Sequence, residues 1–288
     1  MAVQAGKLLV VATPIGNLGD LSPRAADALA NADILACEDT RVTRKLLSLC
    51  GITTSAIVLP YHDHNGHRMR PKLLAALADG KTVVLVSDAG TPLVSDPGYK
   101  LVTACHDAGV TIAAIPGPSA VLAGLAIAGL PSNRFLFAGF VPVSSAAAAA
   151  AFREFADLAV TSIWFDTPKR LSKTLKLMHE IFGNRLAVVA REMTKLYEEY
   201  QRDDLEVLAN RCAAISRLKG EIVILVSGAA PDIRHFDDSE LSIMLSEELR
   251  DKSLRDSVKV VTNITKQPRK RVYELAIAMA NITAVKDE

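Results

Sequence analysis

Short apolar runs alternate with helical segments over the first 117 residues. Strands are predicted at residues 8–13, 34–37, 56–59, 83–86 and 111–115. The segments between them have helix signals, such as Ser22 before Pro23 at a helix start and Gly80 or Gly109 just past a helix end. Strands that alternate with single helices predict a parallel sheet covered on both faces.

Two further regions follow this alternating part of the chain. Residues 118–228 mix strands and helices less regularly, which predicts a mixed α/β domain. The polar stretch 228–239 predicts a linker, and residues 241–279 predict two or three short helices. We therefore expect three domains, at residues 1–117, 118–228 and 229–288.

The most informative stretch is VVLVSDAGTPLVSDPG, residues 83–98. Its first four residues are wholly apolar, as in a central parallel strand, and small or polar turn residues follow at once. Ligands of open α/β sheets bind beyond the carboxyl ends of the strands. Asp88 offers an acceptor there, and Gly90 lets a ligand approach the backbone. A tight crossover without a ligand stays open as an alternative.

Similar turns follow the other strands. TPIGNLGD (residues 13–20) matches neither G-x-G-x-x-G nor a P-loop, so neither a Rossmann dinucleotide site nor an NTPase is supported. EDTR (residues 38–41) could position a hydroxyl or a phosphate, or simply cap a helix. In PGPSA (residues 116–120), Ser119 begins a helix whose free N–H groups could face a ligand. Lys195 could act as a base if its pKa were depressed; otherwise it is a surface charge.

Charge is unevenly distributed along the chain. The formal net charge of +1 does not indicate a general polyanion binder, so any nucleic-acid contact must come from a local patch. Between residues 41 and 72, one acid accompanies six basic residues. This local positive charge is the expected footprint of a phosphate-containing ligand. The basic residues are Arg41, Arg44, Lys45, Arg68, Arg70 and Lys72.

Histidine and cysteine usage excludes some other classes of site. His62, His64 and His67 share a short loop, but His-x-His supplies only two metal ligands, so we predict no metal site. The four cysteines show no C-x-x-C spacing, which fits reduced cytosolic thiols. The most apolar long segment, residues 121–130, is too short to span a bilayer, and the N-terminus lacks a signal-peptide pattern. We expect a cytoplasmic protein with no membrane partner.

The order of these motifs is more specific than any one of them. In sequence, TPIGNLGD, EDTR, HDHN, SDAGTPLVSDPG, PGPSA, AGLP, FDTPKRL, REMTK and KGE resemble the tetrapyrrole-methylase-type S-adenosylmethionine methyltransferases. EDTR, HDHN and SDAGTP resemble in particular the branch that 2′-O-methylates a decoding-centre cytidine of 16S ribosomal RNA in the small ribosomal subunit. The resemblance runs from Lys7 to Val226, and more loosely through the tail.

The resemblance implies a two-domain α/β fold of the class III methyltransferase type. It has a parallel-sheet N-terminal domain, a mixed-sheet second domain and a small helical C-terminal domain. It also implies a homodimer that acts on RNA and not on DNA, with S-adenosylmethionine bent into the cleft between the first two domains. By motif position, the cofactor-binding residues are Pro14, Ile15, Asp88, Ala89, Gly90, Thr91, Ser119, Ala120 and Met193.

The same resemblance suggests which residues act on the RNA that accepts the methyl group. A ribose 2′-hydroxyl is a weak acid, so we expect a base nearby, with Lys195, Asp39 and Glu192 as catalytic candidates. The expected RNA-binding residues are Arg41, Arg44, Lys45, His62, His64 and Arg68. The chain departs from the branch in its alanine run at residues 146–151 and in having Asp166 where a glutamate is usual. A methyltransferase for a tetrapyrrole or other small acceptor, and a non-catalytic ribosome-assembly RNA clamp, are the alternatives.

Overall fold

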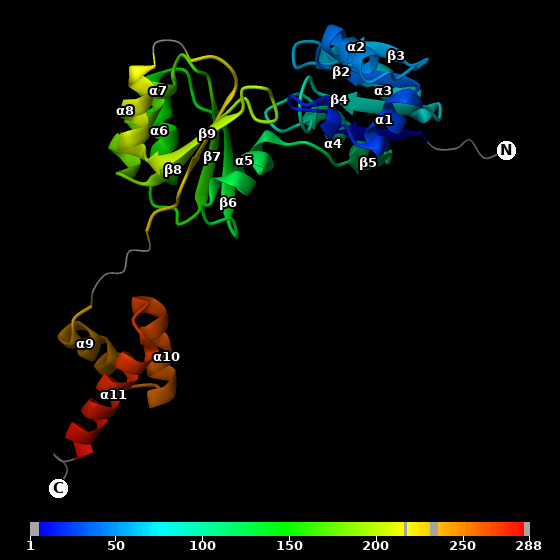
Figure 1. Cartoon of the computed structure of the whole chain (residues 1–288). Helices are drawn as coiled ribbons and strands as arrows, with labels where there is room; N and C mark the ends of the chain where they lie inside the picture. The colour runs from blue at the N-terminus through cyan, green and yellow to red at the C-terminus, as the bar shows by residue number, and fades with distance from the viewer. Residues whose placement is uncertain (1–5, 216–217, 231–235, 285–288) are drawn as a thin grey trace. The chain divides into compact units, whose positions relative to one another are not determined.

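The computed structural model describes residues 6–215, 218–230 and 236–284. The chain divides into two compact units, Met1–Gly228 and Ala229–Glu288 (Figure 1). The first unit contains two sheets of five strands each, and the second contains only helices in its described part. Among the described residues, no helix has the length and apolar character needed to cross a bilayer.

The first sheet is entirely parallel, as predicted, with the order β3-β2-β4-β1-β5. The strand β4 lies between β2 and β1, so the run before SDAGTP is central, as its apolar composition predicts. Every turn that leaves a strand of this sheet therefore emerges at one edge. The strands are β1 (Lys7–Val11), β2 (Ile34–Cys37), β3 (Ile57–Pro60), β4 (Thr82–Val86) and β5 (Thr111–Ile115).

Helices cover both faces of this sheet. The helices α1 (Pro23–Ala30) and α2 (Thr40–Leu49) pack on one face through Leu29 and Leu47. The helices α3 (Gly66–Ala78) and α4 (Tyr99–Asp107) pack on the other through Leu73, Leu77 and Leu101. A short 3₁₀ helix, η1 (Leu18–Asp20), lies in the turn after β1.

The helix α3 begins earlier than the sequence pattern indicates. The sequence pattern predicts a helix over residues 72–78, which begins after Pro71. In the structure, Asn65 closes the preceding turn: its side chain accepts from His62 N (3.0 Å) and donates to Pro60 O (2.9 Å). These bonds begin the helix at Gly66, so Arg68 lies on a helix and not in a loop.

The second sheet is mixed, with the order β6-β7-β10-β8-β9. The strands β6 and β7 are parallel, and all other neighbours are antiparallel. The start of β10 therefore lies beside the ends of β7 and β8, where Ile222 pairs with Asp166 and Arg191. The strands are β6 (Phe135–Phe140), β7 (Thr161–Asp166), β8 (Leu186–Arg191), β9 (Glu199–Asp204) and β10 (Ile222–Val226).

The two faces of the second sheet are covered unequally (Figure 1). On one face lie α6 (Ser145–Phe155), α7 (Leu171–Phe182) and α8 (Leu205–Ala214), around a core that includes Phe152 and Trp164. On the other lies α5 (Ala120–Ala128), against Ile163, Val188 and Leu225. Apolar side chains on α5 and β6 remain exposed, among them Leu122, Ile127, Phe135 and Leu136.

The second unit consists of α9 (Asp238–Glu248), α10 (Leu254–Thr265) and α11 (Arg269–Ala284) in its described part. These three helices agree with the sequence pattern, and their core includes Leu241, Val258 and Val272. The predicted linker extends too far, because Asp237 and Glu240 form a capping box that begins α9 at Asp238. Residues 231–235 of that linker lie outside the described residues.

Candidate active site

The turns that leave β1, β4 and β5 are bonded to one another. Thr13 and Gly90 exchange two backbone hydrogen bonds, of 2.9 and 3.0 Å. The hydroxyl of Thr91 donates to Pro118 O at 3.1 Å. Gly90 has a φ of +78°, and a Cβ there would lie 3.3 Å from Ile15 Cγ2. Glycine is thus required by both the left-handed backbone and the close approach of the β1 turn.

The turn after β2 joins this group through a carboxylate. Asp39 N–H donates to Asp88 Oδ1 at 3.0 Å. The side chain of Asp39 faces the other way and holds Arg41, whose Nε lies 3.1 and 3.2 Å from its two oxygens. Four turns from four strands therefore converge, as the sequence analysis proposed from the edge of a parallel sheet.

A cavity of about 370 Å³ lies over these turns and reaches the second sheet. This volume is within the ordinary range for small-molecule sites, roughly 300–1,000 Å³. Seven of the nine predicted cofactor-binding residues line it: Ile15, Asp88, Ala89, Gly90, Thr91, Ser119 and Ala120. Pro14 does not line it, and Met193 is buried in the core beside Ile15.

The opposite wall comes from the strand ends of the second sheet. Phe140 ends β6, Asp166 ends β7 and Ile222 begins β10, and all three line the cavity. A register shift between Phe137 and Phe140, with Gly139 at φ +75°, ends the regular pairing of β6 with β7. Phe140 then packs against Phe165 with ring centroids 5.3 Å apart. This wall thus combines aromatic and apolar side chains with the carboxyl group of Asp166.

The charged residues of the cavity lining are all acidic: Glu38, Asp88, Asp96, Asp166 and Glu221. Two of them have a basic partner. Asp166 pairs with Arg170 at 2.6 Å, and Glu221 pairs with Lys195 at 3.0 Å. The second oxygen of Asp166 is buried and has no hydrogen-bond partner. The cavity lining thus includes three carboxylates without a salt bridge among the described residues.

The pKa values of these three carboxyls are raised. Burial raises the pKa of Glu38 first, and the charge of Asp88 adds to the effect. Burial also dominates the raised pKa of Asp88. It raises the pKa of Asp96 to about 6, with contributions from Glu38 and Asp88. A cation in the cavity would relieve both the desolvation and the mutual repulsion.

Lys195, Glu192 and Glu221 form a network beside this cavity. Lys195 Nζ lies 2.9 Å from Glu192 Oε1 and 3.0 Å from Glu221 Oε2, and Glu221 N–H also donates to Glu192 Oε1. A Cβ on Gly16 would lie 2.4 Å from Lys195 Cγ, and one on Gly220 would lie 2.4 Å from Glu192 Cγ. Two glycines therefore make room for this network.

None of the three predicted catalytic residues has the pKa shift of a general base. The ion pairs with Glu192 and Glu221 raise the pKa of Lys195, in spite of the opposing effect of burial. Lys195 in turn lowers the pKa of Glu192. Arg41 lowers the pKa of Asp39 to about 2. Each group is held in its charged form, which suits positioning better than proton transfer near neutral pH.

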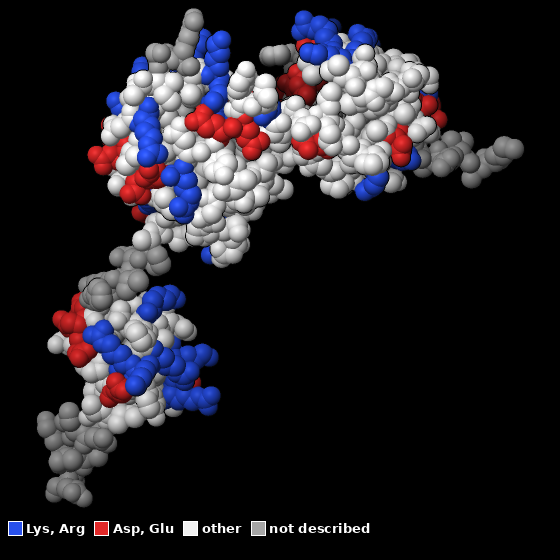
Figure 2. All heavy atoms as spheres, viewed as in Figure 1, with Lys and Arg blue, Asp and Glu red and all other residues white. Residues whose placement is uncertain are grey.

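The predicted RNA-binding residues fall into two groups. Arg41, Arg44, Lys45 and Arg68 are exposed, and the Arg41 side chain retains 86% of its accessible surface. His62 and His64 contact each other, with ring centroids 5.9 Å apart. Burial raises the pKa of Glu38, and the nearby His62 offsets only a small part of that effect. Figure 2 shows basic atoms over α2 and acidic atoms recessed between the parts that carry the two sheets. We call Arg41, Arg44 and Lys45, which all lie on α2, the α2 basic face; Arg68 lies on α3, which packs on the other face of the sheet.

Three acidic residues of the lining, Asp96, Asp166 and Glu221, were not among the predicted site residues. Asp166 ends a strand, so the rule that located Asp88 could have found it. Glu221 precedes β10, and only the antiparallel pairing of that strand places it at this edge. Within the described residues, no group of three or more His, Cys, Asp or Glu side chains could hold a metal ion.

The donor set fits S-adenosylmethionine, which carries a sulfonium, an ammonium group and an adenine ring. Carboxylates without salt bridges suit the two cationic groups, and Asp88 also lies near main-chain groups of the β2 turn. The aromatic wall of Phe140 and Phe165 suits a planar base.

Comparisons with known proteins give a consistent result. A model of the Tetrapyrrole (Corrin/Porphyrin) Methylases matches residues 7–209. A protein of Mesorhizobium japonicum named ribosomal RNA small subunit methyltransferase I is 49% identical over 77% of this chain and 75% of its own length. A protein of the same name from Xylella fastidiosa is 41% identical over 93% of this chain and 98% of its own.

Solved structures show the same fold at low sequence identity. Diphthine synthase aligns with a TM-score of 0.59 and 17% identity, over 77% of this chain and 90% of its own. Uroporphyrin-III C-methyltransferase from Thermus thermophilus, complexed with S-adenosylhomocysteine, aligns with a TM-score of 0.51 and 18% identity, over 76% and 96%. These likenesses establish the two-sheet α/β architecture, which agrees with the fold class expected from the sequence.

Proposed function

The chain belongs to the tetrapyrrole (corrin/porphyrin) methylase family and, within it, to the ribosomal RNA small subunit methyltransferase I proteins, and from this premise we propose its substrate and chemistry. It is an S-adenosylmethionine-dependent methyltransferase that modifies the ribose 2′-oxygen of a decoding-centre cytidine in 16S ribosomal RNA. The observation that carries the proposal is the carboxylate-lined cavity directly beside the α2 basic face.

The cofactor occupies the cavity, held by the predicted residues. Asp88 accepts from a cationic or hydroxyl group, and the backbone of 89–91 lies against the ligand because Gly90 has no side chain. Ser119 and Ala120 contribute the start of α5. Met193 packs in the same core cluster as Ile15 and supports it from behind the lining, and Pro14 precedes Ile15 in the β1 turn. When bound, the cofactor supplies a methyl group on a positively charged sulfur.

Catalysis rests on positioning the acceptor oxygen, since the methyl group is already activated. Lys195, kept as an ammonium by Glu192 and Glu221, would donate a hydrogen bond to an oxygen of the acceptor ribose. As the methyl group passes from the sulfonium to the 2′-oxygen, the hydroxyl proton would leave to water. Asp39 fixes the guanidinium of Arg41, which binds a phosphate of the RNA backbone. Lys195, Glu192 and Asp39 are therefore positioning residues in this proposal.

The RNA lies on the α2 basic face, where Arg44 and Lys45 add exposed cations. The exposed Arg68 of α3 and the His62–His64 pair extend the proposed contact. Because the cavity itself is acidic, phosphates stay outside it while one ribose approaches. The 2′-hydroxyl distinguishes RNA from DNA at such a site.

We also propose a cytoplasmic homodimer. The exposed apolar side chains of α5 and β6 supply a surface for a second copy. All four cysteines are free, which suits a reducing compartment. Sedimentation of the pure protein tests the dimer, and a monomer at micromolar concentration would contradict it.

The decisive experiment transfers tritiated methyl groups to undermethylated small ribosomal subunits, followed by nuclease mapping. We expect label on one ribose in an alkali-resistant dinucleotide. Label on a base, on a small tetrapyrrole acceptor only, or nowhere would overturn the assignment. In single turnover, Lys195→Ala and Asp39→Ala should each slow transfer, and unchanged rates in both would refute the positioning roles.

A further inference from the structure

One surface of the C-terminal helical unit carries cations that neither the fold nor the cavity uses. Residues 257–273 contain five basic residues and no acidic one. Arg255 and Lys259, four residues apart, lie on the same side of α10, and Lys266 follows directly after its last residue. We call Arg255, Lys259, Lys266, Arg269 and Lys270, all exposed, the C-terminal basic face.

Charge in this unit is segregated and not in excess. Residues 236–284 contain eight basic and eight acidic residues. Figure 2 shows most of the basic atoms of this unit on one side in the view and acidic atoms mainly on another. Because the basic residues gather on one side, that side has a positive potential although residues 236–284 as a whole carry no net charge.

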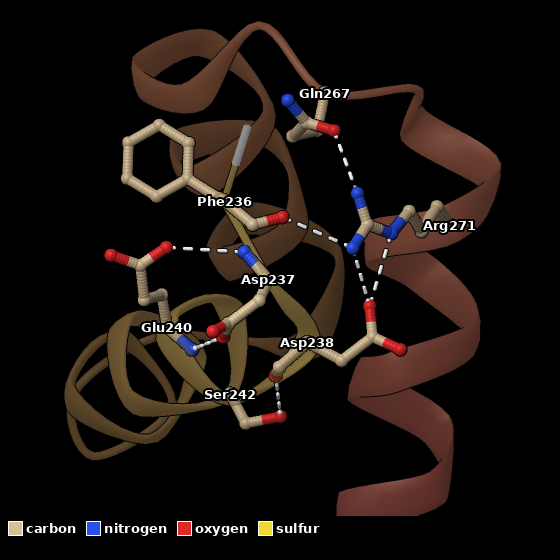
Figure 3. Close-up of polar contacts among 7 residues, drawn as sticks. All are labelled: Phe236, Asp237, Asp238, Glu240, Ser242, Gln267 and Arg271. Atoms are coloured by element: carbon tan, nitrogen blue, oxygen red, sulfur yellow. Dashed lines mark hydrogen bonds and ion pairs between the residues drawn. The ribbon is translucent and has the colours of Figure 1, made fainter. Parts of the chain in front are cut away.

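Arg271 differs from its basic neighbours because it is fully engaged in the fold (Figure 3). Its Nη1 donates to Gln267 Oε1 at 2.8 Å, and its Nη2 donates to Phe236 O at 3.0 Å and Asp238 Oδ1 at 2.6 Å. These bonds attach the start of α11 and the preceding turn to the start of α9. Arg271 therefore holds the turn that presents Lys266, Arg269 and Lys270.

Few acidic side chains pair with the basic residues of this face. On this face the described residues form one ion pair, between Lys270 and Glu274 at 4.0 Å. Lys266 ends α10 in a left-handed conformation at φ +55°, which turns the chain sharply between two basic positions. Like charges placed together at a surface repel one another unless a polyanion binds there.

We propose that the C-terminal basic face binds the phosphate backbone of RNA, as a contact additional to the α2 basic face. The identity of the polyanion rests on the proposed function. The carboxylate-lined cavity repels phosphates, so affinity for RNA must come from surfaces outside it.

The test uses the full-length protein and a fluorescent 30-nucleotide single-stranded RNA, with purified small subunits as a second probe. The face variant is Lys266→Ala/Arg269→Ala/Lys270→Ala. The matched control, Lys100→Ala/Lys173→Ala/Lys176→Ala, removes three exposed charges from α4 and α7. We expect the face variant to lose about 10-fold or more in RNA affinity and to lower the slope of log affinity against log salt by about 2. The control should change affinity less than about 3-fold.

Further measurements separate this inference from the proposed function. Calorimetric uptake of S-adenosylmethionine and the thermal melt should be unchanged in the face variant, whereas Arg271→Ala should unfold the C-terminal unit at lower temperature. The conservative variant Lys266→Arg/Lys270→Arg, which keeps both charges, should bind RNA with the affinity of the wild type. The inference would be overturned if the face variant bound RNA as well as the control variant does. It would also be overturned if the face variant lost binding only to anionic phosphatidylglycerol vesicles. If the wild type takes up no cofactor but the face variant still loses RNA affinity, the proposed function fails and the inference stands.

Discussion

The cavity and the α2 basic face lie at the same edge of the parallel sheet, yet they carry opposite charge and differ in their exposure to solvent. In the cavity, Glu38, Asp88 and Asp96 are partly desolvated, and their pKa values are raised by burial and by one another. On α2, Arg44 and Lys45 are exposed and solvated. A single hydrogen bond from Asp39 N–H to Asp88 connects the two regions.

This difference indicates how each region can bind a ligand. A few desolvated carboxylates interact strongly with one cation, because little water screens them. Many exposed cations each interact weakly with a polyanion, and the contacts add up through release of counterions. Substitutions in the cavity should therefore have large, ligand-specific effects, and substitutions on the basic face should have graded, salt-dependent ones.

The largest effect is expected for Asp88→Asn. The amide keeps an acceptor for Asp39 N–H but removes the charge that faces the cofactor. Loss of a charge-assisted hydrogen bond should weaken cofactor affinity by about 10–100-fold, measured by calorimetry. Asp79→Asn, an equal charge change at an exposed helix end, is the control and should have no effect. Equal affinities would show that the cavity charge is not used.

The next effect is expected for Gly90→Ala, with Gly109→Ala as its matched control. Both glycines have left-handed backbones, at φ +78° and +67°, so both substitutions cost about 1–2 kcal/mol of stability. The methyl group of an alanine at position 90 would press on Ile15 in the cavity wall, whereas one at position 109 would meet no atom within 4 Å. We expect about 10-fold weaker cofactor binding for Gly90→Ala alone. Equal binding by both variants would mean that the turn does not contact the cofactor.

A smaller effect is expected for Arg44→Ala/Lys45→Ala on the α2 basic face. RNA affinity should fall about 5-fold at moderate salt, and the salt slope should decrease by roughly 1 to 2. Cofactor affinity should remain that of the wild type, because neither residue lines the cavity. A change in cofactor affinity without a change in RNA affinity would reverse the roles of the two regions.

The smallest effect concerns pH and Asp96. Its pKa is raised to about 6, so the folded protein holds this proton more tightly than the unfolded chain does. Stability should therefore fall as pH rises from about 4 to 6, the window between the two pKa values. Asp96→Asn removes this cost, so the variant should melt higher than the wild type at pH 7.5 and similarly at pH 4. A lower melting temperature at pH 7.5 would contradict the raised pKa.

The same substitution should weaken the pH dependence of cofactor binding. In the wild type, affinity should rise between pH 5 and 7 as Asp96 ionises. In Asp96→Asn this rise should be smaller, with the remainder due to Glu38 and Asp88, whose pKa values are also raised. Glu240→Gln, on the separate C-terminal unit, is the matched charge control.

Much of the first sheet could be predicted because its signals are local. An apolar run such as the one in β4 can be satisfied only between two other strands, and Ser22 with Pro23 begins a helix on local bonds alone. The start of α3 was missed because a side-chain contact, from Asn65 to Pro60 O, outweighed the unfavourable proline that followed.

The amino-acid sequence by itself determined the alternation of elements, the parallel sheet and the turns that carry Asp88 and Gly90, since each depends on neighbours along the chain. Only the tertiary structure decided that β10 runs antiparallel, so that Glu221 and Ile222 face Asp88 across one cavity. It also decided that Lys195 is held as a cation, because its two carboxylate partners lie 3 and 26 residues away along the chain. Strand direction and ion pairing depend on which distant segments meet, and periodicity within a segment does not contain that information.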